Sequence, residues 1–108
     1  MAIARASAQF FTLDEMVGIL DLDADAVSDS GIKDKLDKLS YAASDFLMAR
    51  TGYDWSADDV KDPLAVDCAS MFVKKRYYEG TAYESEYDLS LGINADLNDL
   101  CIKVSNNG

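Results

Sequence analysis

Three aspartates in an acidic turn have the spacing of calcium ligands. Asp21, Asp23 and Asp25 stand at alternate positions, as do the first three ligands of an EF-hand loop. Such a loop needs glycine at its sixth position for a sharp turn, and this chain has Ala26 there. The twelfth position needs a bidentate glutamate and is Ile32. We therefore expect no calcium site and interpret the segment as an acidic turn before a helix.

The two cysteines, Cys68 and Cys101, are the only candidate thiol nucleophiles. Both stand at apolar positions of expected helices, so we interpret them as buried thiols in a reducing compartment. The chain has no histidine, which removes the commonest general base and metal ligand. No glycine-rich phosphate loop follows a strand. We expect no catalytic site, no metal site and no cofactor.

The charge balance is strongly acidic, with 10 basic and 20 acidic residues among 108 and a net charge of −10. Such a surface repels phosphate, which argues against nucleic-acid binding by charge neutralisation. The acidity serves either solubility alone or a surface that lies near DNA without holding it. No apolar run approaches the ~20 residues of a membrane helix, so we expect a soluble cytosolic protein.

The segment 63–79 predicts a central helix that organises the fold. Asp62 is a suitable N-cap, and Pro63 suits the first helical position. The cations at 74–76 complement the helix dipole near the other end, and Gly80 can end the helix. Apolar residues cover most of the circumference, which is typical of a helix buried against several neighbours. Those neighbours belong either to a monomeric bundle or partly to other copies of the protein.

Apolar residues at helical spacing predict three further helices, over 13–20, 31–50 and 94–104. Thr12 and Glu15 fit a capping box at the first of these. Either Asp29 or Ser30 caps the second, and Gly52 ends it. The sequence therefore predicts an all-α fold, a small bundle of about four helices in a single domain over residues 1–108.

Two segments outside these helices are expected to make contacts of their own. Residues 1–11 predict a flexible N-terminal arm whose Phe10 and Phe11 must dock, because they are too apolar to remain in water. The stretch 81–92 predicts an extended arm, because apolar and acidic residues alternate there. Its apolar members are Tyr83, Tyr87, Leu89 and Leu91.

No second strand in the chain can pair with this extended arm, so its backbone groups need another partner. The arm either lies as a loop across its own bundle or binds another molecule. We predict a partner interface made by Tyr83, Tyr87, Leu89 and Leu91 together with Phe10 and Phe11.

Several of these features follow one another in a fixed order along residues 12–104. They are a short first helix, the turn Asp21 to Asp25, the stripe Ile32, Leu36, Leu39, Ala42, Ala43 and Phe46 closed by Thr51-Gly52, the start Asp62-Pro63-Leu64-Ala65 of a helix ending in Tyr77-Tyr78, and Leu91-Gly92-Ile93 leading into Leu97 and Leu100. In this order they resemble the small head-tail connector, or adaptor, proteins of tailed bacteriophages.

The resemblance implies a structural virion protein that forms a ring, typically of twelve subunits, beneath the portal. Such a ring extends the DNA channel and receives the next stopper or tail protein. The implied partners are further copies of the chain, the portal protein, a stopper or tail-completion protein, and genomic DNA that passes through without sequence-specific binding. The implied location is the head-tail junction of the virion, after synthesis in the host bacterial cytoplasm.

A different class of protein fits the acidity equally well, namely a small acidic cytosolic regulator such as a DNA mimic in a partner's basic groove. The two hypotheses differ in the use of the 81–92 segment. A DNA mimic needs carboxylates held rigidly on its surface, and it does not need an apolar face of tyrosine and leucine side chains.

Overall fold

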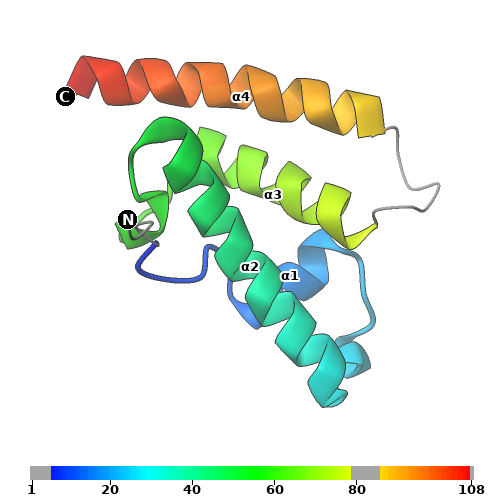
Figure 1. The fold of residues 1–108 in the computed structure, drawn as a ribbon. Helices are drawn as coiled ribbons and strands as arrows, with labels where there is room; N and C mark the ends of the chain where they lie inside the picture. Colours follow the sequence, from blue (N-terminus) through cyan, green and yellow to red (C-terminus); the bar gives the residue numbers. More distant parts are fainter. Residues whose placement is uncertain (1–5, 79–85, 108) are drawn as a thin grey trace, which may run out of the picture.

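The computed structural model describes residues 6–78 and 86–107, of which 86–89 and 107 are described by their backbone alone. Its elements are α1 (Leu13–Ile19), the 3-10 helix η1 (Ala24–Ser28), α2 (Ser30–Thr51), the 3-10 helix η2 (Trp55–Ala57), α3 (Pro63–Tyr77) and α4 (Glu86–Asn107). No strand occurs in the described ranges, and Figure 1 shows a small helical bundle. The predicted all-α fold of about four helices is confirmed.

The expected caps begin and end these helices. Thr12 and Glu15 form the reciprocal capping box of α1. Asp29 caps α2 by accepting from the backbone N–H groups of its first turn. Gly52 ends α2 at φ +81°, a left-handed conformation that glycine adopts at little cost. The boundaries of these two helices therefore follow from local sequence.

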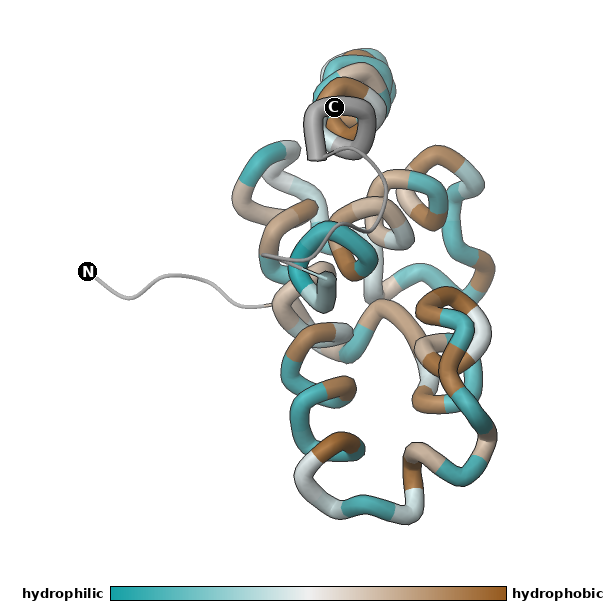
Figure 2. Tube along the Cα trace, turned by 90° about the vertical axis from the view of Figure 1, so that its right-hand side faces the viewer, coloured by the Kyte–Doolittle hydropathy of each residue, from teal (hydrophilic) through white to brown (hydrophobic). Residues whose placement is uncertain are grey.

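Helix α3 occupies the middle of the bundle, between α2 and α4. Figure 1 shows α4 running back along α3 in the opposite direction, and Figure 2, which views α4 nearly end-on, shows it as a layer above the other helices. The face of α3 that is fully buried comprises Ala65, Cys68, Ala69, Phe72 and Val73. The prediction of a central helix with several neighbours is confirmed for the described residues.

The N-terminal segment is docked over residues 6–11, which confirms the predicted docking of Phe10 and Phe11 but shows that the flexible-arm prediction is wrong for residues 6–9. Residues 1–5 lie outside the described ranges. Phe10 and Phe11 are buried, with exposed fractions of 3% and 5%. Ser40 of α2 ties the segment down, since its Oγ accepts from the Phe11 N–H and donates to the Phe11 carbonyl. Apolar anchors and backbone bonds together outweigh the entropy of a free arm.

Helix α4 begins at Glu86, about eight residues earlier than the sequence predicts. The expected extended conformation is therefore wrong for residues 86–92, and the rest of the predicted arm, 81–85 with Tyr83, lies outside the described residues. Gly92 does not break the helix, because it allows close packing on α3: a Cβ there would lie 2.5 Å from the Met71 Sδ. One helical stripe runs along α4 through positions 89, 93, 97, 100 and 104. In the sequence, the alternation of apolar residues at 87, 89 and 91 makes the start of this stripe look like an extended segment.

Cys101 also departs from its prediction, since its side chain is exposed, whereas Cys68 is buried as expected. Cys101 stands one position beyond the buried Leu100 on α4, and its Sγ reaches the Arg50 carbonyl. The reason lies in the packing of α4, whose buried residues Ile93, Leu97 and Leu100 face the bundle and leave Cys101 beside them at the surface.

Candidate interface

The residues of the predicted interface do not form one surface in the described part of the chain. Phe10 and Phe11 pack edge to face in the core, with ring centroids 4.9 Å apart, so they serve the fold. Leu91 is 51% exposed on α4. The backbone of Tyr87 and Leu89 belongs to the first turn of α4. Of the six predicted residues, Leu91 is the one with a described side chain on the surface.

A different surface combines aromatic rings with several cations, where α2 and α3 cross. Phe46 of α2 stacks on Phe72 of α3, with centroids 4.6 Å apart and ring planes 22° apart. Arg50 lies over the Phe46 ring and Arg76 lies over the Phe72 ring, each with its guanidinium carbon 5.3 Å from the centroid. The two guanidinium groups therefore flank one stacked aromatic pair.

Two hollows adjoin this pair and share Phe46, Phe72 and Arg76. One, of about 390 Å³, is lined by Leu39, Ala42, Asp45, Phe46, Phe72 and Arg76. The other, of about 220 Å³, is lined by Phe46, Arg50, Phe72, Lys75, Arg76, Ser90, Ile93 and Asn94. We call this combined surface, with Phe46 and Phe72 as its floor and Arg50, Lys75 and Arg76 at its edge, the cation-rimmed groove.

The cations of this groove have no carboxylate partner among the described residues. The ion pairs found there join Lys38 to Asp34 at 2.9 Å and Lys103 to Asp62 at 2.8 Å, and neither involves the groove. Lys75 and Arg76 lie in the last turn of α3 and Arg50 in the last turn of α2, where they complement the helix dipoles. A locally positive surface thus interrupts a chain of net charge −10.

The cation-rimmed groove is suited to a ligand that carries an anionic group next to an apolar group. A guanidinium presents a planar set of donors that can bind a carboxylate or a phosphate through two hydrogen bonds. An apolar group that covers the aromatic floor would contribute favourable free energy of binding, because both surfaces leave water. The run 74–76 is the one signal of this site in the sequence, since Phe46 and Arg50 join it only through the crossing of α2 on α3.

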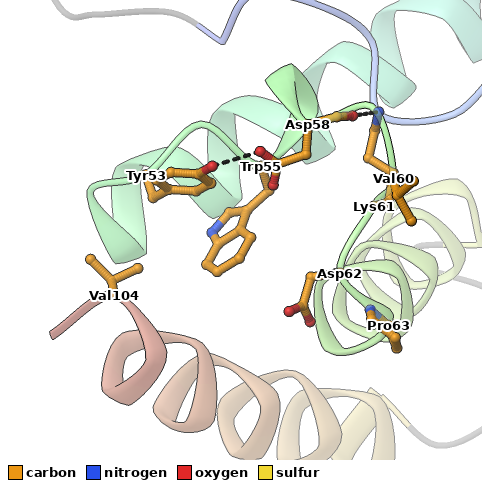
Figure 3. A pocket seen from close by; sticks show the side chains of 8 residues that line it. All are labelled: Tyr53, Trp55, Asp58, Val60, Lys61, Asp62, Pro63 and Val104. Carbon is orange, nitrogen blue, oxygen red and sulfur yellow. Dashed lines mark hydrogen bonds between the residues drawn. The ribbon is translucent and has the colours of Figure 1, made fainter. Parts of the chain in front are cut away.

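Another hollow, of about 550 Å³, lies at the opposite end of α3 (Figure 3). Its lining comprises Tyr53, Trp55, Asp58, Val60, Lys61, Asp62, Pro63 and Val104. The Tyr53 hydroxyl donates to the Asp58 carboxylate at 2.6 Å, and the Lys61 ammonium donates to the Asp58 carbonyl at 2.9 Å. Trp55 is buried and donates from its indole to Thr51.

Asp62 in this hollow is also engaged within the fold. It caps α3 by accepting from the Leu64 and Ala65 N–H groups, and it accepts from Lys103 of α4. Burial opposes its charge, but the bonds from Lys103 and the helix start prevail and lower the pKa of Asp62 below its usual value. The polar groups of this hollow are thus occupied in holding η2, α3 and α4 together.

A carboxyl pair, Asp67 and Asp96, lies between α3 and α4 and is the strongest candidate for acid-base chemistry. Burial, followed by the hydrogen bond and the charge of Asp67, raises the pKa of Asp96 to about 6. The neighbouring thiol offers no nucleophile, because burial raises the pKa of Cys68 to about 12. We therefore interpret this pair as part of the packing between α3 and α4.

Comparison with known proteins yields no family model, no curated protein and no solved structure that matches this chain. Among the described helices, none is both long enough and apolar enough to span a membrane.

Proposed function

We propose that this chain is a structural protein of the head-tail junction of a tailed bacteriophage, where its copies form a ring beneath the portal. The ordered features of residues 12–104 that resemble the connector family support this proposal, and the all-α bundle agrees with the fold that the resemblance implies. In this role the protein extends the DNA channel and presents a surface to the next stopper or tail protein.

The observation that carries the proposal is the cation-rimmed groove. Arg50, Lys75 and Arg76 have no carboxylate partner in the described ranges, so their charges remain available to a binding partner. They become favourable when a partner supplies carboxylates and apolar surface. Arginine and aromatic residues are also the side chains most enriched in protein interfaces. The groove therefore favours an assembling protein.

The acidity has a separate part in the proposed mechanism. The segment 14–29 carries six exposed carboxylates, Asp14, Glu15, Asp21, Asp23, Asp25 and Asp29. A channel wall of this charge repels the DNA phosphates, so the genome slides past without being held. The same charge weakens the association of free copies, so the free chain should assemble only at raised protein concentration, and the portal strengthens this assembly by bringing copies together.

The alternative, a DNA mimic, makes a different use of the surface. Such a protein needs a continuous negative face for the basic groove of its partner, and the groove cations would repel that partner. An enzymatic function is also not proposed, because the polar groups of the hollow at the N-terminal end of α3 are engaged within the fold and Cys68 remains a neutral thiol.

Electron microscopy tests the proposal directly. The purified chain is mixed with the portal protein encoded in the same genome and imaged by negative stain. We expect an added ring of density coaxial with the portal. Portal particles that remain unchanged, together with a chain that competes with DNA for a DNA-binding protein, would refute the connector proposal in favour of the mimic.

The predicted interface residues on α4 can be tested in the same assay. Leu91→Ser should keep the helical circular dichroism spectrum, because this side chain is already half exposed, and should reduce the fraction of portals that carry a ring. Ile102→Ser is the matched control, since Ile102 is a similarly exposed apolar residue of α4, 57% exposed, but lies about three helical turns away. Equal occupancy for wild type and Leu91→Ser would remove Leu91 from the interface.

A further inference from the structure

The loop between η2 and α3 presents the most exposed large apolar side chain in the described ranges. Val60 is 87% exposed, and the exposed Asp59 stands beside it in the chain. The loop is held in place by Asp58, which accepts from Tyr53 through its carboxylate and from Lys61 through its carbonyl (Figure 3). We call Asp59 and Val60 the acidic knob. It offers one apolar group and one carboxylate on a fixed support.

The acidic knob is complementary to the cation-rimmed groove in both charge and polarity. The groove offers aromatic surface from Phe46 and Phe72, with cations at its edge. The knob stands just before the first residue of α3, whereas Arg76 lies in the last turn. The 15 residues of α3 separate the two ends by roughly 22 Å, so the knob of one copy cannot fill the groove of the same copy.

We propose that the acidic knob of one copy docks into the cation-rimmed groove of the next copy. Val60 covers the exposed part of the aromatic pair, and the Asp59 carboxylate binds Arg76 and Lys75. This proposal rests on the proposed function, because it names the contact by which the copies assemble. Two different patches that meet in this way make a head-to-tail contact, which generates a closed ring when the rotation between copies closes.

The acidic turn around Asp25 is another described segment with enough negative charge to enter the groove. Its apolar side chains are not available for that purpose, because Leu22 and Val27 are partly buried against the protein's own core. The turn can supply charge alone, whereas the knob supplies charge and an apolar anchor together. Anchors that fill a hollow carry most of the binding energy of an interface. We therefore choose the knob as the occupant.

Charge reversal in two separate copies tests the contact. Asp59→Arg and Arg76→Glu each place like charges together, and we expect each variant alone to associate at least ~10-fold more weakly than wild type. In an equimolar mixture every contact can pair opposite charges again, because the altered knob of the first variant meets the altered groove of the second, and the natural knob meets the natural groove. Sedimentation velocity over rising protein concentration should therefore show assembly restored in the mixture to a size above a dimer.

Matched controls separate this contact from the change in net charge. Asp25→Arg and Lys38→Glu change the charge by the same amounts at other exposed positions and should assemble as wild type does. Circular dichroism checks that all four variants remain helical. The proposal is overturned if wild type stays monomeric, if either single variant assembles normally, or if the mixture stays monomeric. It is also overturned if Asp25→Arg, rather than Asp59→Arg, weakens assembly and regains it when mixed with Arg76→Glu.

The outcomes also separate this contact from the proposed function. Rings on the portal that survive both single reversals would leave the connector function standing and remove the knob contact. Restored assembly in the mixture, without any ring on the portal, would keep the contact and remove the connector function.

Discussion

The two ends of α3 are stabilised by opposite means. At the N-terminal end, Asp62 caps the helix and accepts from Lys103, while Tyr53 and Lys61 both donate to Asp58. At the C-terminal end, Lys75 and Arg76 have no carboxylate partner among the described residues, and Arg76 lies over the Phe72 ring. At the N-terminal end Asp58 and Asp62 are satisfied within the fold, whereas the cations at the C-terminal end remain available to a partner.

This difference distinguishes structural polar groups from interface polar groups. A buried or half-buried carboxylate that accepts several bonds stabilises the fold, and removing it leaves donors unsatisfied. An exposed cation over an aromatic ring contributes about 0.5–1 kcal/mol, so its removal changes the stability of the monomer little. Substitutions at the two ends should therefore differ sharply in their effects on folding and on assembly.

The largest effect on stability is expected at the aromatic floor of the groove. Phe72 is 6% exposed and stacked on Phe46, so Phe72→Ala should lower the free energy of unfolding by about 3–5 kcal/mol. Urea denaturation followed by circular dichroism measures this loss. Val60→Ala is the contrasting variant and should stay within about 0.5 kcal/mol of wild type. If Val60→Ala lowered the free energy of unfolding as much as Phe72→Ala is expected to, the knob would be part of the core.

The cap of α3 should give the next largest effect. Asp62→Ala removes the acceptor of the first-turn N–H groups and the partner of Lys103, and we expect a loss of about 2 kcal/mol. The same urea titration provides the measurement, with Asp59→Ala as the control on an exposed neighbour. If both variants lose equally little, the N-terminal end of α3 is not fixed by these bonds.

The carboxyl pair should make stability depend on pH in an unusual direction. The pKa of Asp96 is raised from 3.8 to about 6, so its proton stabilises the folded state fully below pH 3.8 and this contribution is lost as the pH rises through about 6. At pH 7, Asp96→Asn should stabilise the fold by about 1 kcal/mol, after allowance for solvent screening. It should also flatten the change in melting temperature between pH 5 and pH 7.

The control for this prediction is Asp25→Asn, an exposed aspartate in η1. This variant should keep the pH dependence of wild type. A wild-type melting temperature that rises from pH 5 to pH 7 would contradict the assignment of Asp96.

The smallest effect on stability is expected at the rim of the groove. Arg76→Gln removes a charge over the Phe72 ring and should cost at most about 1 kcal/mol in urea denaturation. The same variant should weaken self-association clearly in sedimentation experiments. Lys33→Gln, on the exposed start of α2, should change neither property. A large loss of stability in Arg76→Gln would mean that this cation serves the fold, and the contrast between the two ends would fail.

Local signals in the sequence predicted the helix boundaries well where a capping residue stands, whereas the predicted end of α3 at Gly80 lies outside the described residues. Thr12, Asp29, Gly52 and Asp62 mark boundaries through bonds to their own neighbours, so a single sequence reveals them. The start of α4 was not predicted, because the apolar residues at 87, 89 and 91 fit both the two-residue alternation of a strand and, at 87 and 91, the four-residue spacing of a helix. The helical stripe continues through Ile93, Leu97 and Leu100, which are buried in the bundle, and Gly92 lets α4 pack closely on Met71.

The proposed interface is harder to predict from the sequence than the fold. The run 74–76 is visible in the sequence, but its role as a helix C-terminus explains it fully. The run becomes part of a candidate binding surface only because α2 crosses α3 and places Phe46 and Arg50 beside it. A single sequence does not reveal that crossing. Phe10 and Phe11 were correctly predicted to dock, yet the sequence could not say that the receiving surface belongs to the same chain.

The mass of the wild-type assembly tests the central claim most directly. Native mass spectrometry at rising protein concentration measures how many 11.8 kDa chains associate. A closed ring built by head-to-tail contacts predicts one discrete species well above a dimer, with few intermediates. A chain that remains monomeric, or that stops at a dimer, would contradict the assembly of copies through the two ends of α3.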